Sequence, residues 1–216
     1  MSRFCTRISL VGVLLLLCFA SGCSYLLAPG DPPARLNFAP TFGTTTAGNA
    51  KTRSLQVIVV RPSLPLELSG DAIILLVSQR EMRRLAGYRW ASTAPDMLER
   101  AFASALNQSG AFASAAPVTS GITSKYHILS SIDQFVLRVP QTADNTPAGP
   151  SVAIIQGTFR LVNNNEGRTL ATLPIRVEQV APGPGANDMA DAMEKATVKV
   201  MEQVVPWAAN ILGKQK

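Results

Sequence analysis

Hydrophobic residues recur at strand and helix spacing through residues 55–211 and predict the elements of the fold. Between Ala153 and Val177, apolar and polar residues alternate on both sides of residues 163–167, which predicts a hairpin whose strands each have one buried and one wet face. Residues 55–60 are apolar at successive positions, a pattern typical of a central strand covered on both faces. Further strands are predicted at residues 73–77, 81–90 and 126–139.

Two segments carry apolar residues at helical spacing. In the first, Thr93 is a candidate N-cap with Asp96 three residues later, a variant of the capping box, and Ser109-Gly110 ends the helix. The second segment closes the chain, from Met189 to Ile211. Two helices and five or six mostly antiparallel strands predict an α+β fold, a two-layer sandwich with both helices on one face of the sheet. Residues 55–216 are predicted to form its single domain.

The first residues follow a different pattern. Arg3 and Arg7 precede an apolar run at residues 8–19, and Ala20-Ser21-Gly22 supplies the small residues that a signal peptidase needs. The run is shorter than the ~20 residues that cross a bilayer. Residues 1–22 are therefore predicted to be a signal peptide that directs export; the alternatives are a soluble secreted protein and a leader retained as a transmembrane helix.

Cys23 directly follows these small residues, and Ala20-Ser21-Gly22-Cys23 resembles the lipobox of bacterial lipoproteins. In that family the cysteine becomes the N-terminus and carries a diacylglycerol thioether and a further acyl chain. Two or three chains give stable attachment, because each buried methylene contributes ~0.8 kcal/mol. The resemblance implies lipidation of Cys23. Ser24 is not the aspartate that holds enteric lipoproteins at the inner membrane, which favours the outer membrane.

The segment after Cys23, residues 23–54, is rich in Pro, Gly, Thr and Ala and is predicted to be a flexible tether. Roughly 30 residues reach up to ~100 Å when fully extended. The folded body would then stand off from the membrane.

Composition restricts the chemistry of the exported chain. Without residues 1–22 it has 194 residues, with Cys23 as its one cysteine and His127 as its one histidine. These counts exclude a disulfide framework and a Cys/His catalytic pair. A serine hydrolase would need His127 as its base, but His127 lies in an apolar run typical of a strand, and no Gly-x-Ser-x-Gly elbow or phosphate-binding loop is present. We predict no catalytic residues, no cofactor and no metal.

Loss of Arg3 and Arg7 lowers the formal charge from +6 to +4, so the exported chain stays basic. Such a basic surface suits anionic lipid headgroups or an acidic partner. The alternative is a solvated strand edge that charge protects from self-pairing. Nucleic acid is not expected, because the chain is exported and no aromatic platform repeats along the basic stretch. The candidate cluster is Arg80, Arg83, Arg84 and Arg89.

Several short motifs occur in an order that resembles the ABC-type transport auxiliary lipoproteins, the family that includes the paraquat-inducible protein C type. The resemblance covers nearly all of the exported chain. The motifs are Tyr25-Leu26-Leu27 just after the lipobox cysteine, Arg61-Pro62-Ser63-Leu64-Pro65 after a strand, Tyr88-Arg89-Trp90-Ala91 before the first helix, and Ser109-Gly110 with Phe112 after it.

The resemblance implies a lipid-anchored periplasmic protein that works beside an ABC transporter and a mammalian-cell-entry-domain protein in moving lipid between two membranes. Such a protein binds and positions without catalysis, and a homo-oligomer is compatible with that role. Candidate partner contacts are the residue 140–150 loop, the arginine cluster, and Tyr88 with Trp90 if their rings are exposed; the alternative for the two rings is core or edge packing. A structural lipoprotein that braces an outer-membrane complex is the rival function.

Overall fold

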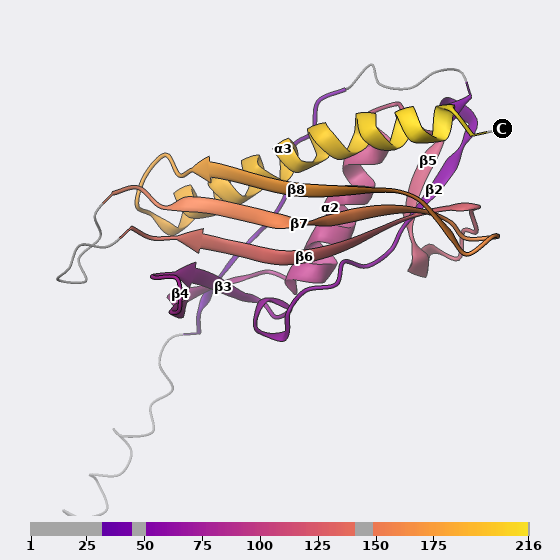
Figure 1. Cartoon of the computed structure of the whole chain (residues 1–216). Helices are drawn as coiled ribbons and strands as arrows, with labels where there is room; N and C mark the ends of the chain where they lie inside the picture. Colours follow the sequence, from indigo (N-terminus) through magenta and orange to yellow (C-terminus); the bar gives the residue numbers. More distant parts are fainter. Residues whose placement is uncertain (1–31, 45–50, 141–148, 216) are drawn as a thin grey trace, which may run out of the picture. The chain divides into compact units, whose positions relative to one another are not determined.

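Strand β6 (Tyr126–Arg138) is the centre of the sheet in the computed structural model, which describes residues 32–44, 51–140 and 149–215. Along one edge, β6 pairs antiparallel with β7 (Val152–Asn163) over nearly its whole length. A tight turn then leads from β7 to β8 (Arg168–Val180), which pairs antiparallel with β7 (Figure 1). The three long strands and the hairpin at residues 163–167 are as the alternating pattern predicts.

The other edge of β6 is shared by two short strands, both parallel to it. β2 (Gln56–Val59) pairs with the start of β6, and β3 (Ala72–Leu76) pairs with its end. Between them the chain leaves the ladder at residues 61–65, apart from one bridge from Ser63 to Ser131. Two prolines in this segment lack the N–H that a ladder needs, which accounts for the interruption.

The outer strands extend both halves of this divided edge. β5 (Ser114–Pro117) pairs parallel with β2, and η4 (Val118–Ser120) follows it. On the other half, β4 (Met82–Trp90) pairs antiparallel with β3, and β1 (Ala34–Leu36) pairs parallel with β4.

The prediction of a mostly antiparallel sheet is therefore wrong: the sheet is mixed, and four of its seven strand pairings are parallel. Its eight strands also exceed the predicted five or six. The parallel pairings arise because β2 and β3 each reach β6 through long crossing connections instead of hairpins. The two additional strands are the short β1 and β5. The α+β class and the two helices are as predicted.

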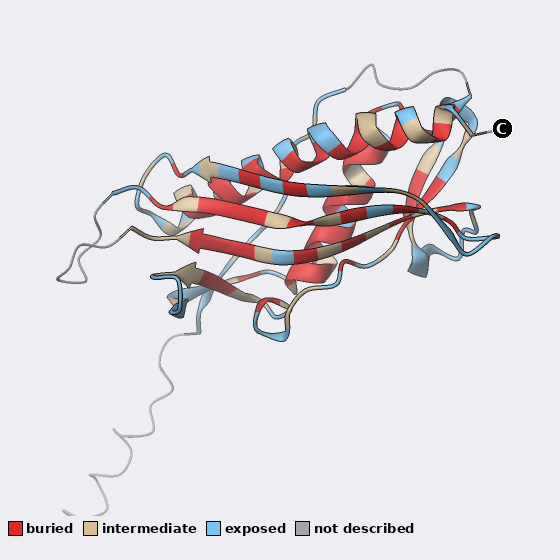
Figure 2. Ribbon diagram, in the orientation of Figure 1, coloured by how far each residue is buried: buried red, intermediate tan, exposed pale blue. Residues whose placement is uncertain are grey.

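Both helices cover the same face of the sheet and lie behind the strands in Figure 1. α2 (Ala94–Gln108) packs on β2 and β5, and α3 (Ala186–Gly213) packs on β7 and β8. The buried residues of both helices, red in Figure 2, belong to one continuous core with buried residues of the strands. In the part of the chain that the structure describes, no helix is both long enough and apolar enough to cross a membrane. The largest fully buried core side chains include Trp90, Phe102, Phe159, Leu98, Leu106 and Ile155.

A second, smaller apolar cluster lies on the other side of the sheet. Val136 of β6 and Ile154 of β7 alternate with residues of the main core, so they face away from the helices. Ile74 of β3 joins them, and Leu68 of the short helix η3 (Leu66–Leu68) covers part of the group. Apolar residues are thus buried on both sides of this end of the sheet.

Candidate functional site

The segment that follows β1 packs on the folded domain. Leu36, Phe38 and Phe42 are partly buried against the main core, although the sequence analysis placed residues 34–44 in the tether. Phe38 packs edge-on against Trp90, with 5.6 Å between ring centroids, and against Phe135 at 6.1 Å. We call residues 37–44 the strap.

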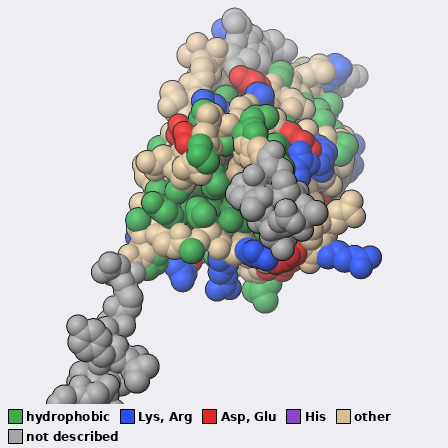
Figure 3. Space-filling view, turned by 90° about the vertical axis from the view of Figure 1, so that its left-hand side faces the viewer, with side chains coloured by type: hydrophobic (Ala, Val, Ile, Leu, Met, Phe, Trp, Pro, Cys, Tyr) green, Lys and Arg blue, Asp and Glu red, His purple; other side chains and the backbone are tan. Residues whose placement is uncertain are grey.

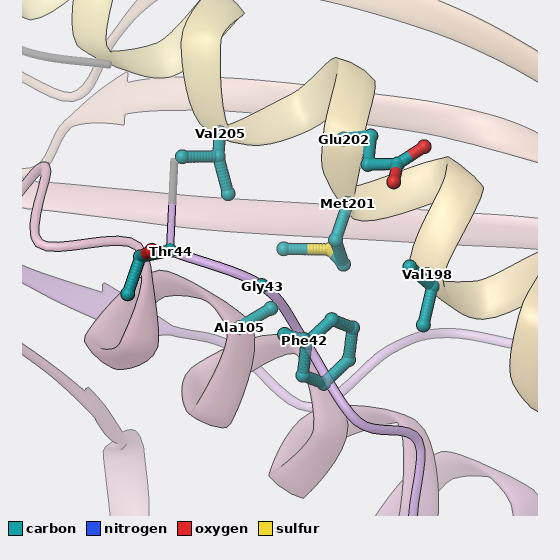
Figure 4. Close-up of a pocket in the computed structure, with 8 residues that line it drawn as sticks. All are labelled: Phe42, Gly43, Thr44, Ala105, Val198, Met201, Glu202 and Val205. Carbon is teal, nitrogen blue, oxygen red and sulfur yellow. The ribbon is translucent and has the colours of Figure 1, made fainter. Parts of the chain in front are cut away.

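The strap crosses the two helices. The backbone N–H of Ala39 donates a 2.8 Å hydrogen bond to Oε1 of Glu194 on α3. Further along, the ring of Phe42 lies over Ala105 of α2 and Met201 of α3 (Figure 4). The cavity left beneath this crossing has a volume of only about 140 Å³, below the ~300 Å³ of an ordinary small-ligand pocket. The strap therefore holds the N-terminal end of the domain against both helices.

The four candidate arginines do not form one patch. Arg83 pairs in the ladder with Leu75, whose side chain contacts the main core, whereas Arg84 pairs with Ile74 of the second cluster. Neighbours across a ladder point to the same side, so these two arginines face opposite sides of the sheet. The structure thus divides a cluster that looks continuous in sequence.

Ion pairs engage two members of this cluster. Nη2 of Arg83 lies 2.6 Å from the carboxylate of Glu81, and Nη1 of Arg89 lies 3.0 Å from that of Asp71. Arg80 and Arg84 are exposed and have no carboxylate partner within the described residues. Exposed ion pairs contribute little stability, typically ~0–1 kcal/mol. Arg80 and Arg84 are the two cations of the cluster available to a partner.

Tyr88 and Trp90 point to the same side of β4 but differ in environment. Trp90 is 2% exposed and packs among Phe38 and Phe135, so its ring is part of the core and not of a contact surface. Tyr88 is 38% exposed. Of the two aromatic candidates, only Tyr88 can meet a partner. Two other candidates, Cys23 and the 141–148 part of the loop, lie outside the described residues.

The Arg61-Pro62-Ser63-Leu64-Pro65 motif joins the sheet to α2. Nε of Arg61 lies 2.7 Å from Oδ1 of Asp96, and the hydroxyl of Thr93 donates to Oδ2. Thr93 is the N-cap residue of α2, but its hydroxyl accepts no backbone N–H, so the predicted capping box does not form. The hydrogen bonds from Arg61 and Thr93 lower the pKa of Asp96, while burial raises the pKa of nearby Glu99.

The sequence analysis missed an ionic cluster on the open face of the sheet. The two oxygens of Glu178 accept from two guanidinium groups, that of Arg138 at 2.9 Å and that of Arg176 at 2.6 Å. Arg176 also donates to the amide oxygens of Gln134 and Gln156. The hydrogen bonds from both arginines lower the pKa of Glu178, and the bond from Arg176 has the larger effect. Each residue of this ionic cluster occupies a polar position on β6, β7 or β8 that faces away from the main core. The alternation of polar and apolar residues along these strands is the one signal of the cluster in the sequence.

No arrangement for metal chemistry appears among the described residues, where no three His, Cys, Asp or Glu side chains converge. His127 lies within β6, between Ile58 of β2 and Val162 of β7, as the strand interpretation predicts.

Comparison with known proteins identifies relatives by sequence and by fold. The chain matches the family model described as "ABC-type transport auxiliary lipoprotein component" over residues 36–205. A Xanthomonas campestris protein assigned to family DUF330 is 25% identical, with a TM-score of 0.70 over 83% of this chain and 97% of that one. A crystal structure of an uncharacterized protein shares the fold at 14% identity, with a TM-score of 0.56 over 76% of this chain and 97% of that one. No curated protein matches.

The family match begins at the last residue of β1 and ends within α3, so it includes the strap, strands β2 to β8 and α2. It thereby agrees with the structure in counting residues 36–44 with the domain. The chain belongs to the family of ABC-type transport auxiliary lipoprotein components.

Proposed function

We propose that this chain is a non-catalytic auxiliary component of an ABC-type lipid transport system, working with the transporter and a mammalian-cell-entry-domain protein. The carrying observation is the family match over residues 36–205, which spans most of the chain. Acylated Cys23 anchors the protein on the periplasmic side of a membrane, and Ser24 favours the outer membrane. The role is to hold a partner in place, since the described site offers cations and an exposed tyrosine but no assembled catalytic group.

The packed strap sets the distance between membrane and domain. Ala34, where β1 begins, stands eleven positions after Cys23, with ten residues between them. Even a fully extended chain of that length spans only about 40 Å, well short of the ~100 Å that a tether ending at residue 54 would allow. β1 pairs directly with β4, so the exposed arginines of β4 lie beside the strand with which the domain begins.

This proximity makes the β3–β4 hairpin the proposed contact surface. Arg84 of β4 and Arg80 of the preceding turn extend exposed guanidinium groups, and Tyr88 adds an exposed ring on the opposite side of β4. Such a surface suits an acidic face of the partner or anionic headgroups of the anchoring bilayer. Ion-pairing in an aqueous environment is screened beyond ~8–10 Å at physiological salt, so the contact has to be close.

Chemical crosslinking in native membranes followed by purification of the intact lipoprotein tests the proposal. A mammalian-cell-entry-domain protein and transporter subunits should co-purify, and recovery should fall for the double variant Arg80→Glu, Arg84→Glu. The matched control is Arg168→Glu, a charge reversal on β8, far from the hairpin in sequence and pairing. Recovery of outer-membrane assembly proteins without any transporter component would instead favour the rival bracing function.

A further inference from the structure

A cavity of about 430 Å³ opens on the face of the sheet opposite α2 and α3, where β3 and β6 end. This volume is within the ~300–1,000 Å³ range of small-molecule sites. Five apolar side chains line it: Leu76, Val77, Val139, Pro140 and Ile154. Ile154 is 1% exposed and belongs to the second apolar cluster, so this wall is held by packed neighbours.

The polar side of the same cavity carries two cations. Arg138 and Arg176 both line it, together with Gln134. Glu178 binds one guanidinium with each oxygen, which holds the two groups close together and leaves a net charge of +1 on the three side chains. Asp133 lies in a separate hollow on the far side of Arg176 and does not line this cavity. The end of the domain seen in Figure 3 shows hydrophobic, basic and acidic side chains next to one another.

The two guanidinium groups keep donors for a ligand. In Arg138, Nη2 is used by Glu178, whereas Nε and Nη1 have no acceptor among the described residues. The Arg138 side chain is 42% exposed and that of Arg176 is 49% exposed, so an incoming group can reach them. Guanidinium groups bind carboxylate and phosphate oxygens in paired, charge-assisted hydrogen bonds.

We propose that this cavity binds an anionic amphiphile, with its acidic head on Arg138 and Arg176 and its hydrocarbon chain along Leu76 and Ile154. A purely inorganic anion would leave the apolar wall uncovered, and a neutral chain would leave Nε and Nη1 of Arg138 without an acceptor among the described residues. The combination of an apolar wall and adjacent cations selects a molecule that carries both parts. The site adjoins the hairpin surface proposed above, because residues 76–79 of the β3–β4 hairpin line one side of it, but its two cations come from β6 and β8.

Photolabelling of the intact lipoprotein, purified in dodecyl maltoside, tests this site. The probe is an alkyl phosphate with a diazirine on its chain, and labelled residues are located by tandem mass spectrometry. We expect labels on residues 75–79 and 138–140, with competition by dodecyl phosphate but not by inorganic phosphate at equal concentration. A diazirine alkyl maltoside should not label these residues, because it lacks the anion.

Two variants separate the cations from the fold. The double variant Arg138→Gln, Arg176→Gln should reduce labelling at least about tenfold, given ~1.5–3 kcal/mol for a hydrogen bond to a charged group. If that variant fails to fold, Gln79→Asp gives the answer, because Gln79 is exposed at the cavity and an added carboxylate repels the anion. Its matched control is the uncharged Gln79→Asn.

Selective labelling that Gln79→Asp lowers and Gln79→Asn leaves unchanged supports the site. Equal labelling by the phosphate and maltoside probes, labels spread over the whole surface, or equal labelling of the two Gln79 variants would overturn it. The ionic cluster would then serve only to brace the strands. Such a failure leaves the transport proposal standing, since co-purification of the transporter components tests that proposal separately.

Discussion

Replacing Phe38 by alanine distinguishes a packed strap from a flexible tether. If residues 23–54 were a tether, truncation of an aromatic ring at position 38 would leave the stability of the domain unchanged. In the structure the ring is partly buried and packs edge-on against Trp90 and Phe135. Removing it should therefore destabilise the domain.

The expected loss follows from these contacts. An aromatic pair contributes ~0.5–1.5 kcal/mol beyond buried area, and Phe38 makes two such pairs. Burial of a whole phenylalanine side chain contributes ~1.5–3 kcal/mol, of which a partly buried ring keeps roughly half. Together these terms predict a decrease of about 2–4 kcal/mol in the free energy of unfolding. That is a large part of the ~5–15 kcal/mol typical of a native domain.

Urea unfolding followed by far-ultraviolet circular dichroism measures this loss, in a Cys23→Ser background that removes the acylation site. With a slope near ~2 kcal/mol per molar urea, the midpoint should fall by about 1–2 M. Asn37→Ala is the control, because its exposed neighbouring side chain should shift the free energy by under ~0.5 kcal/mol. Equal midpoints for the two variants would refute the packed strap and restore the longer tether.

Four further substitutions test the fold and its electrostatics. Trp90→Ala should cost ~3–5 kcal/mol and Tyr88→Ala under ~1 kcal/mol, as measured by urea midpoints; similar losses would contradict their different burial. Gly157→Ala places a Cβ 2.3 Å from the carbonyl oxygen of Ser131, so thermal unfolding should show a loss of ~1–3 kcal/mol, and an unchanged melting temperature would count against this close approach. The pKa of Asp96 is lowered in the folded state, so its carboxylate stabilises the domain at pH values above its unfolded pKa of ~3.9 and loses that effect as the pH falls through the folded pKa. The difference in unfolding free energy between wild type and Asp96→Asn should therefore be full at pH 7 and vanish in acid. A difference that does not depend on pH would argue against the ion pair.

Long periodic segments could be predicted from the sequence because each pattern repeats over several turns or pleats. β6, β7, β8 and both helices are of this kind. β1 and β5 have three and four residues, too few for a period to emerge. Strand partners were also out of reach, because parallel pairing of β2 and β3 with β6 depends on long connections and leaves no local signature.

The burial and direction of side chains at the site could not be predicted from the local sequence either. Tyr88 and Trp90 share one face of β4, and only the packing of Phe38 and Phe135 decides that Trp90 is the buried one. The arginines of residues 80–89 are close in sequence, yet alternation along a strand sends Arg83 and Arg84 to opposite sides.

In the cavity on the open face, the fold brings together residues that are distant in the sequence. Its cations are far apart in sequence, Arg138 on β6 and Arg176 on β8, and they meet because the register across β7 brings Glu178 between them. Composition and motifs carry no trace of such a register, so the cavity becomes visible only in three dimensions.

Intact mass spectrometry of the N-terminal peptide of the protein from native membranes tests the central claim most directly, namely that Cys23 anchors this domain close to a membrane. The account predicts a chain that begins at Cys23 and carries a thioether-linked diacylglycerol with a further acyl chain. An uncleaved leader with a free thiol at Cys23, or a mature N-terminus at any other residue, would contradict it.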